Sequence, residues 1–243
     1  MRIRTSALTV RYGAVAALSE VSLDIGSGER RAVIGPNGAG KTTLFKAIAG
    51  EIRPSSGRAI LDDRDVTRLP SWRRARLGLS RTFQRSTLFP DLTVAENLGL
   101  SVRARLGSAW HFWPGWAGNG GRREVEERLE LAGLGSVARS RAGSIAHGEQ
   151  RALEIELALA AEPRALLLDE PMAGLSGAER QQALARLQRL PAQVTLVIVE
   201  HDLDAVFTIA DRISVLDHGL LIADGTAAEV RNNPRVQEVY LGV

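Results

Sequence analysis

The amino-acid sequence predicts an α/β fold with three parts: a core of parallel strands, an antiparallel β subdomain and an inserted α-helical subdomain. Three patterns support this prediction. Apolar and polar residues alternate near the N-terminus, short apolar runs return near the C-terminus, and the stretch between them mostly has the period of helices. We expect a single domain over residues 1–243, with the helical subdomain at about 92–161.

The N-terminal region has the alternation typical of antiparallel strands that bury one face. Residues 3–10 alternate, and Val21–Ile25 repeats the period of two. Arg31–Ile34 then leads into a glycine-rich loop, and Thr43–Glu51 carries apolar residues on one side of a predicted helix. The order of strand, glycine-rich loop and helix is the context in which a phosphate-binding motif is meaningful.

The C-terminal half contains continuous apolar runs, which are typical of parallel strands covered on both faces. These runs are Ala165–Leu168, Val194–Val199 and Ile213–Leu216. After them, Asp217–Gly225 predicts a hairpin, and a short helix is expected to reach the C-terminus. In the predicted helical stretch, Glu124–Ala132 is charged on one side and apolar on the other, as an amphipathic helix requires.

Composition limits the classes of function that the chain can have. The absence of cysteine excludes disulfides, zinc sites with cysteine ligands and a thiol nucleophile. The 31 Lys and Arg and the 28 Asp and Glu residues are interspersed, which favours a solvated surface and no nucleic-acid partner. No run approaches the ~20 apolar residues that span a bilayer, so we expect membrane contact only through a partner or a surface patch.

The run GPNGAGKTT satisfies the phosphate-binding motif GxxxxGK[ST]. Glycine permits the backbone angles that turn successive N–H groups toward one phosphate, and the helix that follows directs its positive end to the same anion. Lys41 can reach the β- and γ-phosphates, and the Thr42 hydroxyl can ligate Mg²⁺. We therefore expect a P-loop NTPase core that binds ATP. The residues of this phosphate loop are Gly35, Pro36, Asn37, Gly38, Ala39, Gly40, Lys41, Thr42 and Thr43.

Two later strands end in side chains that suit ATP hydrolysis. Asp169 ends an apolar strand, where it should face the phosphate loop and hold Mg²⁺ through its water shell. Glu170 follows it and could act as general base toward the attacking water. His201 follows the next apolar strand and could reach the γ-phosphate, and Gln84 in the run RTFQ could bridge Mg²⁺ and the water. The expected catalytic residues are Lys41, Gln84, Glu170 and His201, and the expected metal ligands are Thr42, Gln84 and Asp169.

These motifs resemble those of the nucleotide-binding subunit of an ATP-binding cassette (ABC) transporter, over nearly the whole chain. The resemblance identifies Gly35–Thr43 as the Walker A loop, Gln84 as the Q-loop residue and His201 as the switch histidine. It also identifies Glu170, in LLLDEP, as the catalytic base of Walker B. Tyr12 lies where the family has an aromatic residue that stacks on adenine. The resemblance thus implies ATP and Mg²⁺ as cofactors and ATP hydrolysis as the activity.

The run IAHGEQ at Ile145–Gln150 lies where the family has its signature, LSGGQ, at the start of a helix. The resemblance implies that this signature segment contacts the ATP bound by an opposing subunit, so that two ATPase subunits are needed. The residues expected to make this contact are Ala146, His147, Gly148 and Glu149.

Three residues depart from the family pattern. Ala146 replaces the signature serine, His147 replaces a glycine, and Ser176 replaces the usual aspartate of the D-loop, Ala173–Ser176. The sequence does not determine how these changes affect contacts with the ATP that the opposing subunit binds. They do not alter the Walker residues or the switch histidine, so we expect an active ATPase.

Leu153-Glu154-Ile155 after the signature, the run RTFQRSTLFPDLTVAENL and the ending NNPRVQEVYLG resemble the ATPases of branched-chain amino acid uptake systems. This resemblance implies a peripheral subunit on the cytoplasmic face of the inner or plasma membrane, with transmembrane permease subunits as partners. The second ATPase subunit can be identical or different. A urea or amide importer and a lipopolysaccharide-type exporter are the alternatives, and the sequence does not define the transported solute.

Other classes of ABC protein fit the sequence less well. ATPases of DNA repair and chromosomes insert long coiled coils between Walker A and the signature, and translation-associated proteins carry two cassettes. The stretch between Lys41 and Ala146 has no sustained heptads, and the chain has one of each motif. An ATP-gated clamp without turnover remains a third alternative.

An aromatic cluster in the predicted insertion has two interpretations. It can contact a permease or lipid headgroups, or it can pack within the insertion itself, which is the interpretation that we favour. Its residues are Trp110, Phe112, Trp113 and Trp116.

Overall fold

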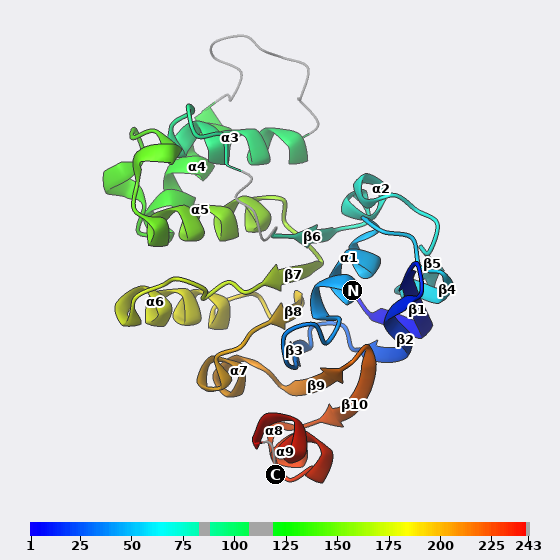
Figure 1. Ribbon diagram of the computed structural model, residues 1–243. Coiled ribbons are helices and arrows are strands. Elements are labelled where there is room, and N and C mark those ends of the chain that lie inside the picture. The colour runs from blue at the N-terminus through cyan, green and yellow to red at the C-terminus, as the bar shows by residue number, and fades with distance from the viewer. Residues whose placement is uncertain (83–87, 107–118, 242–243) are drawn as a thin grey trace. The chain divides into compact units, whose positions relative to one another are not determined.

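The computed structural model describes residues 1–82, 88–106 and 119–241, which form two compact units (Figure 1). The first unit holds both β-sheets, and the second is helical. The first comprises Met1–Arg81, Arg164–Pro171 and Leu187–Val243, and the second comprises Thr82–Pro163 and Met172–Arg186.

The smaller sheet of the first unit is antiparallel, as the alternating N-terminal pattern predicts. Its order is β2-β1-β4-β5. Ile3 and Thr5 are buried, and so are Leu8 and Val10, so the period of two holds on each side of a register shift between Thr5 and Leu8 and not without a break over residues 3–10. The strands are β1 (Ile3–Tyr12), β2 (Val15–Ile25), β4 (Ser56–Leu61) and β5 (Arg64–Asp65).

The larger sheet has the order β10-β9-β3-β8-β7-β6, and all of its neighbouring pairs except β9 and β10 are parallel. Every residue of β7 and β8 is buried, which confirms the prediction from their apolar runs. β9 and β10 form the predicted hairpin. The strands are β3 (Arg30–Ile34), β6 (Leu79–Arg81), β7 (Ala165–Asp169), β8 (Thr195–Val199), β9 (Arg212–Asp217) and β10 (Leu220–Gly225).

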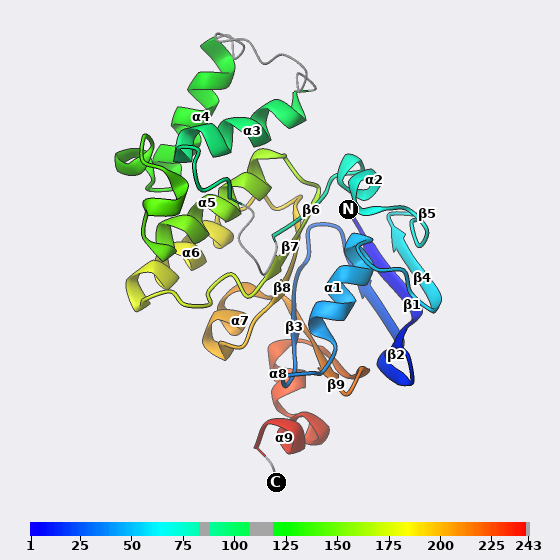
Figure 2. The same cartoon turned by 45° about the horizontal axis from the view of Figure 1, so that its top comes forward.

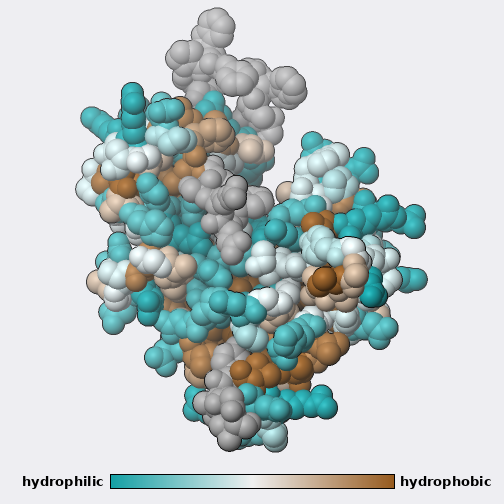
Figure 3. Space-filling model, in the orientation of Figure 1, coloured by the Kyte–Doolittle hydropathy of each residue, from teal (hydrophilic) through white to brown (hydrophobic). Residues whose placement is uncertain are grey.

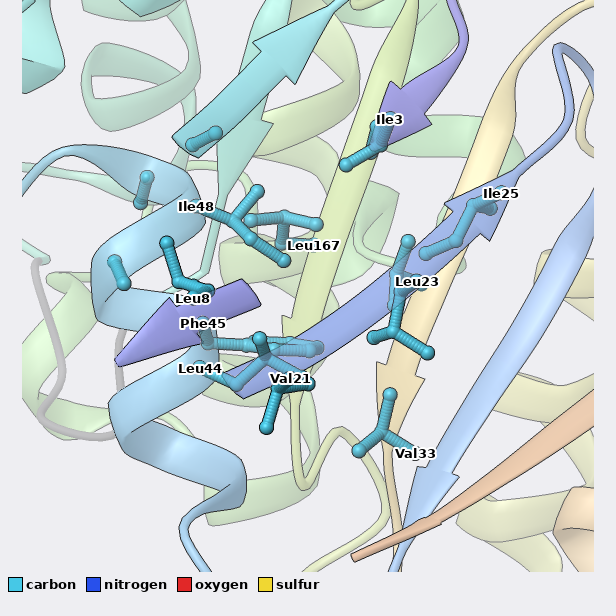
Figure 4. Packing of buried hydrophobic residues seen from close by; sticks show 14 of the residues in the cluster. Ile3, Leu8, Val21, Leu23, Ile25, Val33, Leu44, Phe45, Ile48 and Leu167 are labelled. Atoms are coloured by element: carbon cyan, nitrogen blue, oxygen red, sulfur yellow. The ribbon is translucent and has the colours of Figure 1, made fainter. Parts of the chain in front are cut away.

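Helix α1 (Lys41–Ala49) lies between the two sheets (Figure 2). Its apolar side chains meet residues of both sheets in one cluster, where Phe45 and Ile48 lie near Leu167 of β7 (Figure 4). The helix begins two residues before the predicted Thr43, because the left-handed backbone of Gly40 ends the loop there. It ends at Ala49, where the N–H of the next residue donates to the carbonyl of Ala47.

The remaining helices of the first unit are short. The sequence predicts one helix at the C-terminus, whereas the structure has two, α8 (Ala227–Arg231) and α9 (Pro234–Leu241). Pro234 explains the break, because proline is well placed at the first position of a new helix and cannot continue an old one. The other helices are α2 (Ser71–Arg76) and α7 (Leu203–Ile209).

The second unit packs its helices around a separate apolar cluster. Val125 and Leu129 of α4 face this cluster, which confirms the amphipathic helix predicted at Glu124–Ala132. Two 3₁₀ turns, Gly135–Val137 and Ala142–Ser144, connect α4 to α5. The helices are α3 (Val94–Arg105), α4 (Asn119–Leu131), α5 (His147–Ala160) and α6 (Gly177–Gln188), whose last two residues belong to the first unit.

In the described part of the chain, no helix is both long and apolar enough to cross a membrane. Hydrophilic residues cover much of the face that Figure 3 shows.

A buried arginine closes the end of α1. Arg74 of α2 is 1% exposed, and its guanidinium donates to the carbonyls of Ala47 at 2.8 Å and Ile48 at 2.6 Å. It also donates to the carbonyl of Leu69 at 2.9 Å. Burial lowers the pKa of Arg74 to about 10, so the side chain remains a cation at neutral pH. A positive charge at the C-terminal carbonyls of a helix stabilises that helix.

We predict that Arg74→Met lowers the free energy of unfolding by about 3 kcal/mol, because it leaves buried carbonyls without their donor. Urea unfolding followed by circular dichroism measures this change. Arg58→Met is the control, since Arg58 is largely exposed and lies 4.0 Å from Asp65. Similar small changes in both variants would contradict the role of Arg74.

Candidate functional site

The phosphate loop is held tightly between neighbouring backbones. A Cβ atom at Gly35 would lie 2.1 Å from the carbonyl oxygen of Leu216, and one at Gly40 would lie 2.5 Å from that of Ala17. Both glycines have positive φ, which L-residues rarely adopt. Only glycine therefore fits at these two positions, and the concave loop that results has the shape that a phosphate group requires.

The turn between β9 and β10 braces this loop. The N–H of Gly219 donates to the carbonyl of Ala39 at 3.0 Å, and the N–H of Ser19 donates to the carbonyl of Gly219 at 2.8 Å. The sequence predicts the hairpin but gives no sign that its turn contacts the loop, because this contact joins segments that are far apart in the chain.

Lys41, the first residue of α1, lies across the loop. Its side chain is 6% exposed, and Nζ donates to the carbonyls of Gly35 at 2.7 Å and Pro36 at 2.9 Å. Burial lowers the pKa of Lys41, while the carboxylates of Glu170 and Asp169 act in the opposite direction. The ammonium group is thus positioned where the oxygens of a bound phosphate could replace its present carbonyl acceptors.

The two predicted acidic residues lie at the carboxyl end of β7. Asp169, the last residue of β7, is fully buried, and its Oδ2 accepts a hydrogen bond from Arg81 at 3.2 Å. Glu170 has a positive φ, and its N–H donates to the carbonyl of Val199 at the end of β8. A positive φ is uncommon for a residue other than glycine and often accompanies a functional constraint.

Glu170 and His201 meet at this edge. The distance between Oε1 of Glu170 and Nε2 of His201 is 2.9 Å, and both side chains are partly exposed. The sequence predicts both residues for the site, although it cannot predict that they form a pair. A carboxylate beside an imidazole is suited to accept a proton from water and to keep a fixed orientation.

Tyr12 ends β1 and is 54% exposed, so its ring is accessible for stacking. Gln84 and the aromatic cluster at Trp110, Phe112, Trp113 and Trp116 lie outside the described residues.

The residues present fit a magnesium nucleotide. Asp169 supplies a buried carboxylate, and Thr42 lies in the first turn of the helix that follows the phosphate loop. Among the described residues, no group of three or more His, Asp or Glu side chains could hold a metal ion by itself.

The signature segment begins α5 in the second unit. Ala146 is the N-cap residue, and its N–H donates to Oε2 of Glu149 at 2.9 Å. Alanine lacks the side-chain oxygen with which serine would accept a hydrogen bond from the first turn. The departure from the family pattern therefore removes half of a capping box and leaves the other half in place.

The signature segment contacts the D-loop within the same unit. A Cβ atom at Gly174 would lie 3.0 Å from Cε1 of His147, so the imidazole covers this glycine. Ser176 and Glu179 are joined at the start of α6: the N–H and Oγ of Ser176 donate to Oε2 of Glu179 at 2.8 and 2.7 Å, and the N–H of Glu179 donates to Oγ of Ser176 at 3.5 Å. The other oxygen of Glu179 lies over Gly148, where a Cβ atom would be only 1.9 Å away, so the carboxylate must move if a side chain is added there.

Comparison with known families agrees with these motifs. The family model described as ABC transporter matches residues 18–173, and one described as branched-chain amino acid ATP-binding cassette transporter matches residues 221–243. The chain belongs to the ABC transporter family. This confirms the fold and the family that the Walker motifs and the signature segment predict.

Two curated relatives of this ABC chain cover it almost completely. The high-affinity branched-chain amino acid transport ATP-binding protein BraF of Pseudomonas aeruginosa is 37% identical over 99% of the chain and 97% of the relative. LivG of Salmonella typhimurium, which carries the same description, is also 37% identical, with the same coverage. These relatives confirm the predicted resemblance to the branched-chain amino acid group.

Solved structures of ABC cassettes have the same fold. The ADP conformation of an ATP-binding cassette of an ABC transporter has a TM-score of 0.84 and 29% identity, with full coverage of both chains. A dimeric cassette in a post-hydrolysis state, bound to ADP and phosphate, has a TM-score of 0.80 and 25% identity over 92% of this chain and 98% of its own.

We predict that Gly148→Ala lowers the free energy of unfolding by about 1 kcal/mol. The new methyl group displaces the Glu179 carboxylate, and a lost helix cap costs about that amount. Thermal unfolding of the two variants measures the difference. Gly177→Ala is the matched control, because a Cβ atom there meets nothing within 4 Å. Equal stability of the two variants would contradict the close contact.

Proposed function

We propose that this chain hydrolyses ATP on the cytoplasmic face of a membrane and energises the uptake of branched-chain amino acids. The observation that carries the hydrolytic part is the 2.9 Å contact between Glu170 and His201, at the edge of the sheet that also bears the phosphate loop. The descriptions of the curated relatives support the choice of solute.

The proposed hydrolysis uses residues from three strand ends. The main-chain N–H groups of the phosphate loop and the Lys41 ammonium bind the β- and γ-phosphates. Glu170 accepts a proton from the attacking water as the water oxygen bonds to the γ-phosphorus and the bond to ADP breaks. His201 orients the Glu170 carboxylate. Thr42 and Asp169 would hold Mg²⁺, which would neutralise charge on the phosphates.

The proposed site has further parts that bind nucleotide. Tyr12 stacks on the adenine, and Gln84 bridges the metal and the attacking water. In a dimer, the signature segment, Ala146 to Glu149, contacts the ATP held by the other ATPase subunit. The dimeric cassette among the solved structures supports such a pairing. The partner can be a second copy or a different ATPase chain, and permease subunits complete the transporter.

The solute can be tested by reconstitution. The chain, its permeases and their binding protein are assembled in vesicles, and ATP-driven uptake of leucine, isoleucine and valine is compared with that of urea. We expect uptake of the branched-chain amino acids only. Uptake of urea or an amide, or export from the vesicles, would instead support the alternative transporter classes.

We predict that Lys41→Met weakens ATP binding by about 10- to 100-fold, since a hydrogen bond from a charged donor contributes about 1.5–3 kcal/mol. Equilibrium titration with a fluorescent ATP analogue measures the affinity. Lys46 is the only other lysine of the chain and lies on the same helix, so Lys46→Met is the matched control. Equal affinities in both variants would contradict the role of Lys41.

We predict that Glu170→Gln lowers the steady-state ATPase rate by about 10²-fold or more, the usual contribution of a general base, while ATP still binds. Phosphate release measures the rate, and the same titration measures binding. Equal rates in wild type and variant would favour the alternative of an ATP-gated clamp without turnover.

A further inference from the structure

Arg81 lies next to the proposed metal carboxylate, and the proposed hydrolysis does not use it. It ends β6, which pairs in parallel with β7 so that Arg81 lies opposite Leu167. Asp169 follows Leu167 by two positions, and alternate residues of a strand face the same side of a sheet. The register therefore directs the side chains of Arg81 and Asp169 to the same face.

The guanidinium of Arg81 joins two acidic side chains. Its Nη2 lies 3.2 Å from Oδ2 of Asp169, and its Nη1 lies 2.5 Å from Oε1 of Glu51, just after α1. The Arg81 side chain is 6% exposed and that of Asp169 is fully buried, so little water screens their attraction. The ring of Phe45 lies 5.9 Å from the guanidinium and covers it from the side of α1.

Arg81 and Lys41 differ in how they can compensate the negative charge of Asp169 when a nucleotide binds. Both cations lie close enough to Asp169 to compensate its buried charge in the structure. In the proposed function, the Lys41 ammonium binds the phosphates of ATP, so less of its charge compensates that of Asp169. Glu51 holds Arg81 from the other side, so that Arg81 stays with the protein when nucleotide binds.

We propose that Arg81 is a positioning residue, which holds Asp169 by Oδ2 so that the carboxylate meets the Mg²⁺ of the nucleotide in a fixed orientation. Glu51 anchors Arg81 in this role. The inference rests on the proposed function of Asp169. A simple structural role, in which the ion pair only fastens β6 to β7, would stabilise the fold without affecting the metal.

The experiment measures how strongly Mg²⁺ increases nucleotide affinity in the full-length chain. A fluorescent ATP analogue is titrated in excess Mg²⁺ and in excess EDTA, and the ratio of the two dissociation constants is the readout. In wild type we expect tighter binding with Mg²⁺. In Arg81→Met we expect the ratio to fall by about tenfold or more, the usual effect of removing a residue that orients a metal ligand.

The same variant should bind the analogue in EDTA as wild type does, because the phosphate loop is unchanged. Arg81→Lys keeps the charge but cannot hold Asp169 and Glu51 together, so we expect an intermediate ratio. Arg164→Met is the matched control. Arg164 forms a more exposed pair with Asp62 at 3.0 Å in the same unit, and its loss should leave the ratio unchanged.

An Arg81→Met variant with the wild-type ratio would overturn the inference, even if its stability fell. A variant that binds less tightly in Mg²⁺ and EDTA alike would also overturn it. If Mg²⁺ did not increase the nucleotide affinity of the wild-type chain, the proposed metal site would be wrong, and this inference would be wrong as well. Should Arg81→Met not fold, the ratios of Arg81→Lys and Glu51→Gln decide: a fall in both supports the inference, and wild-type values overturn it.

Discussion

Main-chain hydrogen bonds between β7 and β8 hold Asp169 beside Val199, and β3 joins β8 through the same parallel pairing. Since parallel strands end at the same edge of a sheet, this register gathers three segments that are distant in sequence. The phosphate loop follows β3, Glu170 follows β7 and His201 follows β8. A slip of one residue in β7 would turn Asp169 to the other face of the sheet. The chemistry of the site thus depends on strand register.

Close backbone packing constrains the conformation of the phosphate loop. Gly35 and Gly40 lie against carbonyl oxygens of β9 and β2, and the turn at Gly219 holds the loop by hydrogen bonds. A preorganised loop loses little conformational freedom when it binds an anion. Lys41 occupies the loop with its own hydrogen bonds, so the amine is already close to the position in which it would bind a phosphate.

The residues that depart from the family pattern are compensated by local contacts. At the start of α6 the Ser176 hydroxyl donates to the Glu179 carboxylate, a bond that an ionised acidic side chain could not make, and at the start of α5 Glu149 accepts from the N–H of Ala146. His147 lies on Gly174, so the signature segment and the D-loop touch through an imidazole. The start of α5 thus keeps one half of its capping box, and the start of α6 keeps both halves.

Local motifs allowed the sequence by itself to determine the phosphate loop, seven of the ten described strands and the acidic end of β7, whereas it gave no prediction for β4, β5 and β6. Each of these depends on residues that are consecutive or that repeat with a fixed period. Gln84 remains a prediction from its motif. Only the tertiary structure decided that Glu170 pairs with His201 and Arg81 with Asp169, residues 31 and 88 positions apart. Periodicity specifies which face a side chain occupies, whereas strand order and register specify its neighbours.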